Sequence, residues 1–197
     1  MTGRREQNKI QCREDILKAS RRLFSSKGYN AAKMEDIAKK ASVSKATLYN
    51  YFQSKESLLI GTVEEVYSEV QSSCEQSETS GIPADECLYQ AFKILVLSSL
   101  KYPRLAQRIT WLNADPESSL YQCLGPVVDL IRKLVDPLFA GTAGDSGHAA
   151  DHAMETLLGI YYVALYHWSY TYPDDESQIL ERLHDIYWNA WIRYARR

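Results

Sequence analysis

The sequence lacks a long run of apolar residues. Its most apolar stretches are interrupted by Lys, Arg, Tyr or Ser well before the roughly 20 residues that a membrane-spanning helix needs. The N-terminus begins MTGRREQNK and continues into a polar, charged segment, so the apolar core of a signal peptide is missing. Both absences predict a cytoplasmic chain with no membrane partner.

Cysteine is scarce, and the usual motifs of catalysis are missing. Cys12, Cys74, Cys87 and Cys123 are widely separated and form no CxxC pair. This fits reduced thiols better than a disulfide framework. No nucleophile elbow, glycine-rich phosphate loop or HExxH helix is found. We therefore expect neither an enzyme nor a bound cofactor.

Ligands for a metal are few as well. His148 and His152 are four residues apart with Asp151 between them, a spacing that suits metal binding. However, a third ligand is not evident, and no cysteine is near in sequence. We therefore predict no metal site.

Charge is distributed unevenly along the chain. Residues 1–60 hold 13 Lys and Arg against 6 Asp and Glu, a net charge of +7. Residues 61–197 hold 10 against 19, a net charge of −9, and the whole chain carries −2. A basic end on an acidic body suggests that only the first part meets a polyanion, although a chance distribution of solvated charges is the alternative.

Glycine and proline are few, at 9 and 6 residues, and apolar residues recur at spacings of three and four. This pattern predicts an all-α chain with a three-helix N-terminal head and a larger helical body. Nine helices are expected, over about 9–27, 33–40, 45–52, 54–77, 84–101, 104–113, 118–139, 149–171 and 175–196.

The second and third expected helices are joined by the turn Ala41–Ser44, which is the layout of a helix-turn-helix. Ala38 is small enough for a close helix crossing, and Val43 can fill the core below the turn. Ser44 can cap the third helix through its hydroxyl.

The third helix should present one face to the core and the other to a groove. Leu48 and Phe52 are four residues apart and therefore point inward. The side chains left to face outward are Lys45, Ala46, Thr47, Tyr49, Asn50 and Tyr51.

The segment Ile16–Leu59 holds several anchors at fixed offsets. They are LF–KGY at the end of the first expected helix, M–DIA in the second, VSKxTLYxYF in the third and SKE–LL at the start of the fourth. With these anchors the segment resembles the DNA-binding region of the TetR family of transcriptional regulators. The resemblance covers 44 of 197 residues. We expect a DNA-binding domain over residues 1–54 and an effector-binding and dimerisation domain over residues 55–197.

The resemblance implies that Tyr49 and Lys55 contact DNA phosphates. Lys45 could read guanine or bind phosphate, Thr47 could pack on a thymine methyl, and Asn50 could contact an adenine edge or a phosphate. The complete predicted DNA-binding set is Ser44, Lys45, Ala46, Thr47, Tyr49, Asn50, Tyr51 and Lys55.

Two positions depart from the family's pattern. Ser42 stands in the turn where these proteins usually have Gly, which predicts a slightly strained or differently formed turn. Ala32 stands where Thr commonly precedes the second helix, which puts a cap and a phosphate contact there in question. A three-helix packing unit without DNA affinity is the alternative.

The first nine residues carry Arg4, Arg5 and Lys9. They could form an arm that reaches a minor groove. A disordered, solubilising tail is the alternative and the one favoured by the sequence.

A helix-turn-helix works in pairs, because two copies roughly 34–36 Å apart grip successive major grooves. The resemblance implies a homodimer held by the last two long helices in a four-helix bundle. Some apolar residues of these helices must pack internally, and the sequence does not separate the two uses. The predicted interface residues are Leu157, Leu158, Leu165, Trp168, Ile179, Leu183, Ile186 and Ala190.

Aromatic residues are abundant, with 14 Tyr and 4 Trp, and the densest run is YYVALYHWSYTY over 161–172. Tyr and Trp combine apolar area with a polar tip, which suits pockets and interfaces alike. Ordinary core and dimer packing is therefore the alternative at each position. The predicted pocket for an aromatic or cationic small molecule consists of Phe92, Trp111, Tyr161, Tyr162, Tyr166 and His167.

Together these features predict a transcriptional regulator whose partners are a double-stranded DNA operator, a second copy of itself and a small-molecule effector. We expect a repressor whose effector prefers a different spacing of the two heads and so lowers operator affinity. The alternatives are an activator or a ligand-independent regulator on the same fold, and a helical binding protein without DNA affinity.

Overall fold

The computed structural model describes residues 3–139, 148–173 and 175–191. Every regular element in these ranges is helical, which confirms the predicted all-α fold. If each continuous helix is counted once, the described ranges hold nine helices, as the sequence predicts. None of them is both long and apolar enough to cross a lipid bilayer.

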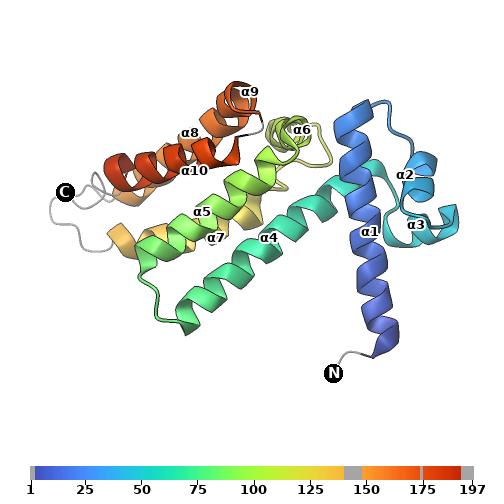
Figure 1. Cartoon of the computed structure of the whole chain (residues 1–197), viewed down its shortest axis with the longest axis horizontal. Helices are drawn as coiled ribbons and strands as arrows, with labels where there is room; N and C mark the ends of the chain where they lie inside the picture. The colour runs from blue at the N-terminus through green and yellow to red at the C-terminus, as the bar shows by residue number, and fades with distance from the viewer. Residues whose placement is uncertain (1–2, 140–147, 174, 192–197) are drawn as a thin grey trace. The chain divides into compact units, whose positions relative to one another are not determined.

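The chain divides into two compact units (Figure 1). Unit 1 consists of Met1–Glu65 together with Gln107–Cys123, and unit 2 consists of Val66–Ala106 together with Leu124–Arg197. Two of the three boundaries between the units fall inside helices, and the third lies in the turns before Gly125. The functional boundary at residues 54 and 55 stays a prediction.

Unit 1 contains α1 (Arg4–Lys27), α2 (Met34–Lys40), α3 (Lys45–Tyr51), the start of α4 (Lys55–Thr79) and the end of α6 (Pro103–Ala114). Each helix buries apolar residues at helical spacing. The most deeply buried side chains are Ile16, Leu17, Ile37, Leu48, Leu58 and Leu59.

Unit 2 contains the rest of α4 and α6, with α5 (Ala84–Leu100), α7 (Gly125–Phe139), α8 (Ala149–Val163) and α10 (Glu176–Asp185). The π-helical segment η1 (Ala164–Trp168) continues α8 into α9 (Ser169–Thr171), and a second such segment, η2 (Ile186–Trp191), continues α10.

Aromatic residues of η2 close the core of unit 2. Tyr187 is buried, stacks on Trp191 with ring centroids 5.1 Å apart, and donates its hydroxyl to the Asp85 carbonyl at 2.7 Å. The Trp191 indole N–H donates to the Ala153 carbonyl at 3.2 Å. Because both polar tips are satisfied, these large rings can be buried without a desolvation penalty.

Two helix starts differ from the sequence prediction. The helix expected from residue 118 begins only at Gly125, because residues 115–124 form a series of turns with Gln122 in the left-handed region at φ 58°. Pro126 explains the late start, since a proline fits the first turn of a helix but breaks its interior. At the other end of the chain, α1 starts at Arg4 rather than near residue 9.

Candidate nucleic-acid interface

Two backbone hydrogen bonds build the turn between α2 and α3. The Ser42 N–H donates to the Lys39 carbonyl at 3.2 Å. The Val43 N–H donates to the Ala38 carbonyl at 3.0 Å. This Schellman arrangement places the residue after the helix end in the left-handed region. Ser42 occupies that position with φ 58°, so the turn carries the strain expected where glycine is replaced.

Ser44 begins α3 as its N-cap. Its hydroxyl oxygen accepts the Thr47 backbone N–H at 3.0 Å and lies 2.8 Å from the Thr47 hydroxyl oxygen. One of the free N–H groups at the helix start is thereby satisfied, as the sequence predicted. The start of α2 differs, because its N-cap Lys33 forms no side-chain cap bond and Ala32 before it is buried.

Two inward anchors hold α3, and a glycine on α4 makes room for one of them. Leu48 and Phe52 are both buried, as predicted. A Cβ placed on Gly61 would lie 2.8 Å from a Phe52 ring carbon and 3.0 Å from a Leu17 methyl. Only glycine therefore permits this close approach. Sequence reasoning missed Gly61, although a single glycine inside a helical pattern signals such a contact.

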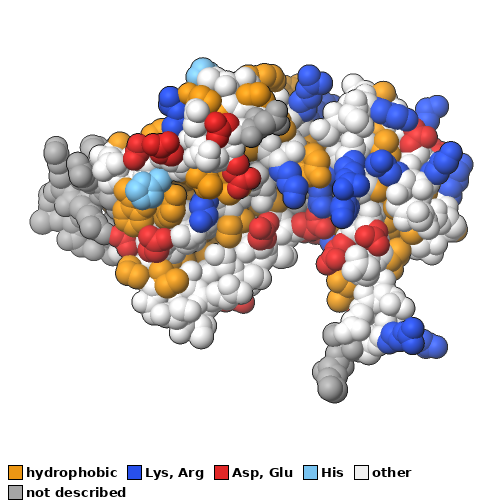
Figure 2. Space-filling view, in the orientation of Figure 1, with side chains coloured by type: hydrophobic (Ala, Val, Ile, Leu, Met, Phe, Trp, Pro, Cys, Tyr) orange, Lys and Arg blue, Asp and Glu red, His pale blue; other side chains and the backbone are white. Residues whose placement is uncertain are grey.

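The outer face of α3 presents four of the six predicted side chains. Lys45, Ala46, Tyr49 and Asn50 are exposed, and the exposed fraction of Tyr49 is 44%. Lys and Arg side chains also lie along α1 and around α2 on the face shown in Figure 2. A short helix with an exposed amide, phenol and ammonium group can bind phosphates and base edges.

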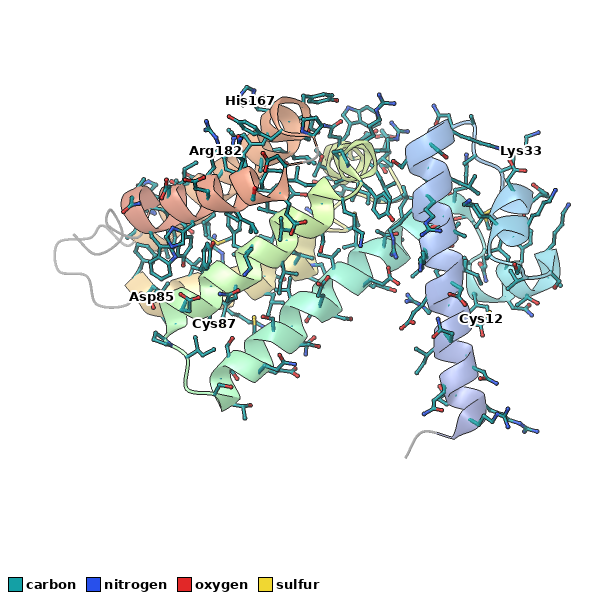
Figure 3. The ribbon with its side chains drawn as sticks, in the orientation of Figure 1. Cys12, Lys33, Asp85, Cys87, His167 and Arg182 are labelled. Carbon is teal, nitrogen blue, oxygen red and sulfur yellow. The ribbon has the colours of Figure 1, made fainter. Side chains whose placement is uncertain are left out.

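The other two predicted side chains are half-buried. Thr47 is bonded to Ser44, as described above. Desolvation, followed by the neighbouring Cys12 thiol on α1, raises the pKa of Tyr51. Figure 3 labels Cys12 on the stretch of α1 that passes α3. The Arg13 guanidinium carbon on α1 lies 5.5 Å from the centre of the Phe52 ring, so the end of α3 contacts α1.

Lys45 is paired in the free protein. Its ammonium group lies 3.2 Å from the Glu35 carboxylate on α2, and both side chains are largely exposed. A hydrogen bond from the residue's own backbone and the contact with Lys45 lower the pKa of the Glu35 carboxyl. Exposed pairs of this kind contribute little to stability because solvent screens them, so a phosphate can replace Glu35 at little cost.

Lys55 lies in a cluster that fixes the loop between α1 and α2. Its ammonium group donates to the Tyr29 carbonyl at 2.9 Å and to the Asn30 carbonyl at 3.3 Å, and it lies 4.6 Å from the centre of the Tyr29 ring. The Tyr29 hydroxyl donates to the Glu56 carboxylate at 2.8 Å. The KGY and SKE sequences thus contact each other, a link that sequence reasoning did not foresee.

The end of α6 adds a second cation to this cluster. The Arg108 guanidinium carbon lies 5.6 Å from the centre of the Tyr29 ring and 4.8 Å from that of Trp111. Burial, together with the bond to Glu56, raises the pKa of Tyr29 well above its usual range. Lys55 and Arg108 therefore both lie against the neutral Tyr29 ring of this loop. Arg108 belongs to the segment 107–123, which is part of unit 1.

The six predicted pocket residues differ in burial and are divided between the two units. Phe92 and Tyr161 lie in the buried core of unit 2, where the Tyr161 hydroxyl is 3.0 Å from the Ser99 hydroxyl. Tyr162, Tyr166 and His167 are exposed on α8 and η1. The sixth residue, Trp111, belongs to unit 1 and its exposed fraction is 56%.

Most of the predicted interface residues pack inside unit 2 instead. The reason is that the inward faces of α8, η1 and α10 complete its core. Among the eight residues, Leu158 and Ala190 are exposed and Ile186 is half-buried. The five buried residues are Leu157, Leu165, Trp168, Ile179 and Leu183. The outward face of the same helical run instead carries Leu158, Tyr162, Val163, Tyr166 and Tyr170.

Residues 16–61 match the family described as "Bacterial regulatory proteins, tetR family". The HTH-type transcriptional repressor KstR of Mycobacterium tuberculosis is 29% identical over 130 residues, which are 65% of this chain and 56% of that protein. The HTH-type transcriptional repressor NicS of Pseudomonas putida is 37% identical over 67 residues, which are 34% of this chain and 32% of that protein. The chain thus covers about half or less of these relatives.

The fold is also found among solved structures. The transcriptional regulator FadR from Bacillus subtilis, in complex with stearoyl-CoA, superposes with a TM-score of 0.67 at 18% sequence identity. The match covers 88% of this chain and 95% of that one. At this identity the likeness concerns the fold, and it extends well beyond the helix-turn-helix.

Proposed function

We propose, from the premise that the chain belongs to the TetR family through residues 16–61, that it is a sequence-specific DNA-binding transcriptional regulator. The observation that carries this proposal is the outer face of α3, where Lys45, Tyr49 and Asn50 stand exposed on a helix capped by Ser44. Regulators of this class are not enzymes, and they act where the chromosome lies, in the cytoplasm.

Binding to a duplex from the region upstream of the chain's own coding sequence tests this proposal. We expect a steep loss of affinity with rising salt, because phosphate contacts release counterions. Tyr49→Ala should weaken binding to all duplexes alike, whereas Asn50→Ala should also change sequence preference. Tyr121→Ala is the matched control, since the exposed fraction of Tyr121 is 47%. Equal binding by the Tyr49 and Tyr121 variants would refute the contact.

Lys45 and Lys55 should behave differently from each other. Glu35→Gln frees the Lys45 ammonium group and should tighten binding, because the lysine no longer needs to exchange partners. Lys55→Ala should weaken binding and also destabilise unit 1, since two loop carbonyls lose their donor. Thermal unfolding measured beside DNA affinity separates these two effects of Lys55.

We place the homodimer on the outward face of α8, η1 and α9. Leu158, Tyr162, Tyr166 and Tyr170 recur there at intervals of four, and each side chain is at least 39% exposed. Tyr162 and Tyr166 stack with ring centroids 6.0 Å apart. Covering this stripe would remove a large apolar surface from water. Tyr166→Asp should yield monomers in sedimentation velocity and Tyr121→Asp dimers; a dimeric Tyr166→Asp protein would exclude this face.

We further propose that a small molecule binding to residues 55–197 releases the protein from its operator, which makes it a repressor. The support is the likeness to FadR, whose structure holds stearoyl-CoA. An aromatic or cationic effector remains the prediction from the aromatic run, and an acyl-CoA is the second candidate. Thermal shift with compounds of all three kinds, followed by DNA release, decides among them. A reporter assay with and without the protein separates repression from activation.

A further inference from the structure

The first turns of α1 form a surface that the packing of unit 1 does not require. Residues 3–11 are all exposed, and the first fully buried side chain of the helix is Ile16. In Figure 1 this part of α1 extends past α2 and α3. It carries Arg4, Arg5 and Lys9 against a single carboxylate, that of Glu6. We call these residues, 4–11, the basic start of α1.

The cations of this surface have no carboxylate partners. Some other cations of unit 1 are paired: Arg13 lies 2.5 Å from Glu64, and Lys27 lies 3.1 Å from Asp36. Arg4, Arg5 and Lys9 form no ion pair within the described part of the chain. Like charges on adjacent turns repel one another, and an external polyanion would relieve this repulsion.

The basic start of α1 adjoins the recognition helix. The Arg13 guanidinium carbon, one turn beyond Lys9, lies 5.5 Å from the centre of the Phe52 ring at the end of α3. The basic start of α1 therefore leads directly into the part of the helix that contacts α3. A duplex that receives α3 therefore brings its phosphates close to these cations.

We propose that the basic start of α1 is a second DNA-binding surface, in which Arg4, Arg5 and Lys9 bind the phosphate backbone beside the groove entered by α3. This inference rests on the proposed function, because it requires the recognition helix to meet DNA. It replaces the arm or disordered tail expected from the sequence with a preformed helix. A preformed helix loses less conformational entropy on binding than a disordered arm.

The test compares two triple variants of the whole chain. One is Arg4→Ala, Arg5→Ala and Lys9→Ala; the control, with the same charge change in unit 2, is Lys101→Ala, Arg104→Ala and Lys133→Ala, all at exposed positions. Alanine is the best helix former, so α1 stays helical, which circular dichroism verifies. The probes are a 30-base-pair duplex from the upstream region and a random duplex of the same length.

We expect the first variant to lose about 0.9 in salt slope for each phosphate contact removed, equally on both duplexes. Glu6→Gln should act in the opposite direction and tighten binding, since it removes a carboxylate that repels phosphate. A salt slope equal to that of the unit 2 variant would overturn the proposal and leave the proposed function intact. A parent protein without any steep salt dependence would overturn both.

Discussion

The end of α2 in unit 1 and the end of α4 in unit 2 form the same turn with different residues. At the end of α4 the Ile82 N–H donates to the Ser77 carbonyl at 3.0 Å and the Gly81 N–H donates to the Glu78 carbonyl at 3.2 Å. The end of α2 has the same two bonds. The left-handed position holds Gly81, at φ 67°, in unit 2, whereas it holds Ser42, at φ 58°, in unit 1. The two hydrogen bonds therefore set the backbone conformation of the turn. The residue in the left-handed position sets only the energetic cost of that conformation.

The largest expected effect comes from the close packing of unit 1. Gly61→Ala should lower the free energy of unfolding by about 1–3 kcal/mol, because a methyl group there overlaps the Phe52 ring. Gly125→Ala in unit 2 is the control, since no atom lies within 4 Å of its new Cβ. Urea unfolding measures both. Equal stabilities would show that Phe52 can move aside.

The next effect tests the turn of unit 2. Gly81→Ser should destabilise the protein by about 1–2 kcal/mol, because a side chain must enter the left-handed region. Nothing lies within 4 Å of a Cβ at Gly81, so backbone strain alone is measured. An unchanged midpoint of urea unfolding would mean that serine costs nothing in this turn.

The reverse change in unit 1 should have a smaller effect. Ser42→Gly should stabilise the protein by about 0.5–1 kcal/mol, because relief of strain is partly offset by the greater freedom of glycine in the unfolded chain. Thermal unfolding of Ser42→Gly, Gly81→Ser and the double variant completes the comparison. A destabilised Ser42→Gly protein would show that the serine side chain contributes something the turn needs.

The smallest expected effect is on stability at acidic pH. The Tyr29 hydroxyl and neighbouring donors outweigh desolvation, which acts in the opposite direction, and hold the pKa of Glu56 below its ordinary value of 4.5. This contribution to stability is present above pH 4.5 and is lost as the pH falls through the lowered pKa. In the Glu56→Gln variant, the free energy of unfolding should therefore fall less steeply as the pH drops below 4.5. A profile that kept its shape would assign the acid sensitivity to other carboxylates.

The sequence predicted most of unit 1 because its signals are local. Ser44 caps α3 through a bond to a residue three positions away, and Leu48 and Phe52 are buried by helical periodicity alone. The strain at Ser42 could be predicted because glycine is the residue that suits the left-handed position of this turn. The contact of Arg108 with the Tyr29 ring could not be foreseen, since it joins residues that are 79 positions apart and no short pattern encodes it.

The surface of unit 2 was harder to predict for a related reason. Leu157 and Leu158 are adjacent and chemically alike, yet one completes the core and the other is exposed. Their assignment depends on the rotation of α8 about its axis, which packing against distant helices decides. Segments such as η1 also shift the register of every residue after them.

Residues 107–123 belong to unit 1 although 41 residues of unit 2, from Val66 to Ala106, separate them from Glu65. The chain must therefore close a long loop before Arg108 can reach Tyr29, which slows late assembly relative to local helix formation. A fragment that ends at Glu65 would lack the part of unit 1 that residues 107–123 form. Chimaeric proteins that exchange the DNA-binding domain should therefore include residues 107–123 together with residues 1–65.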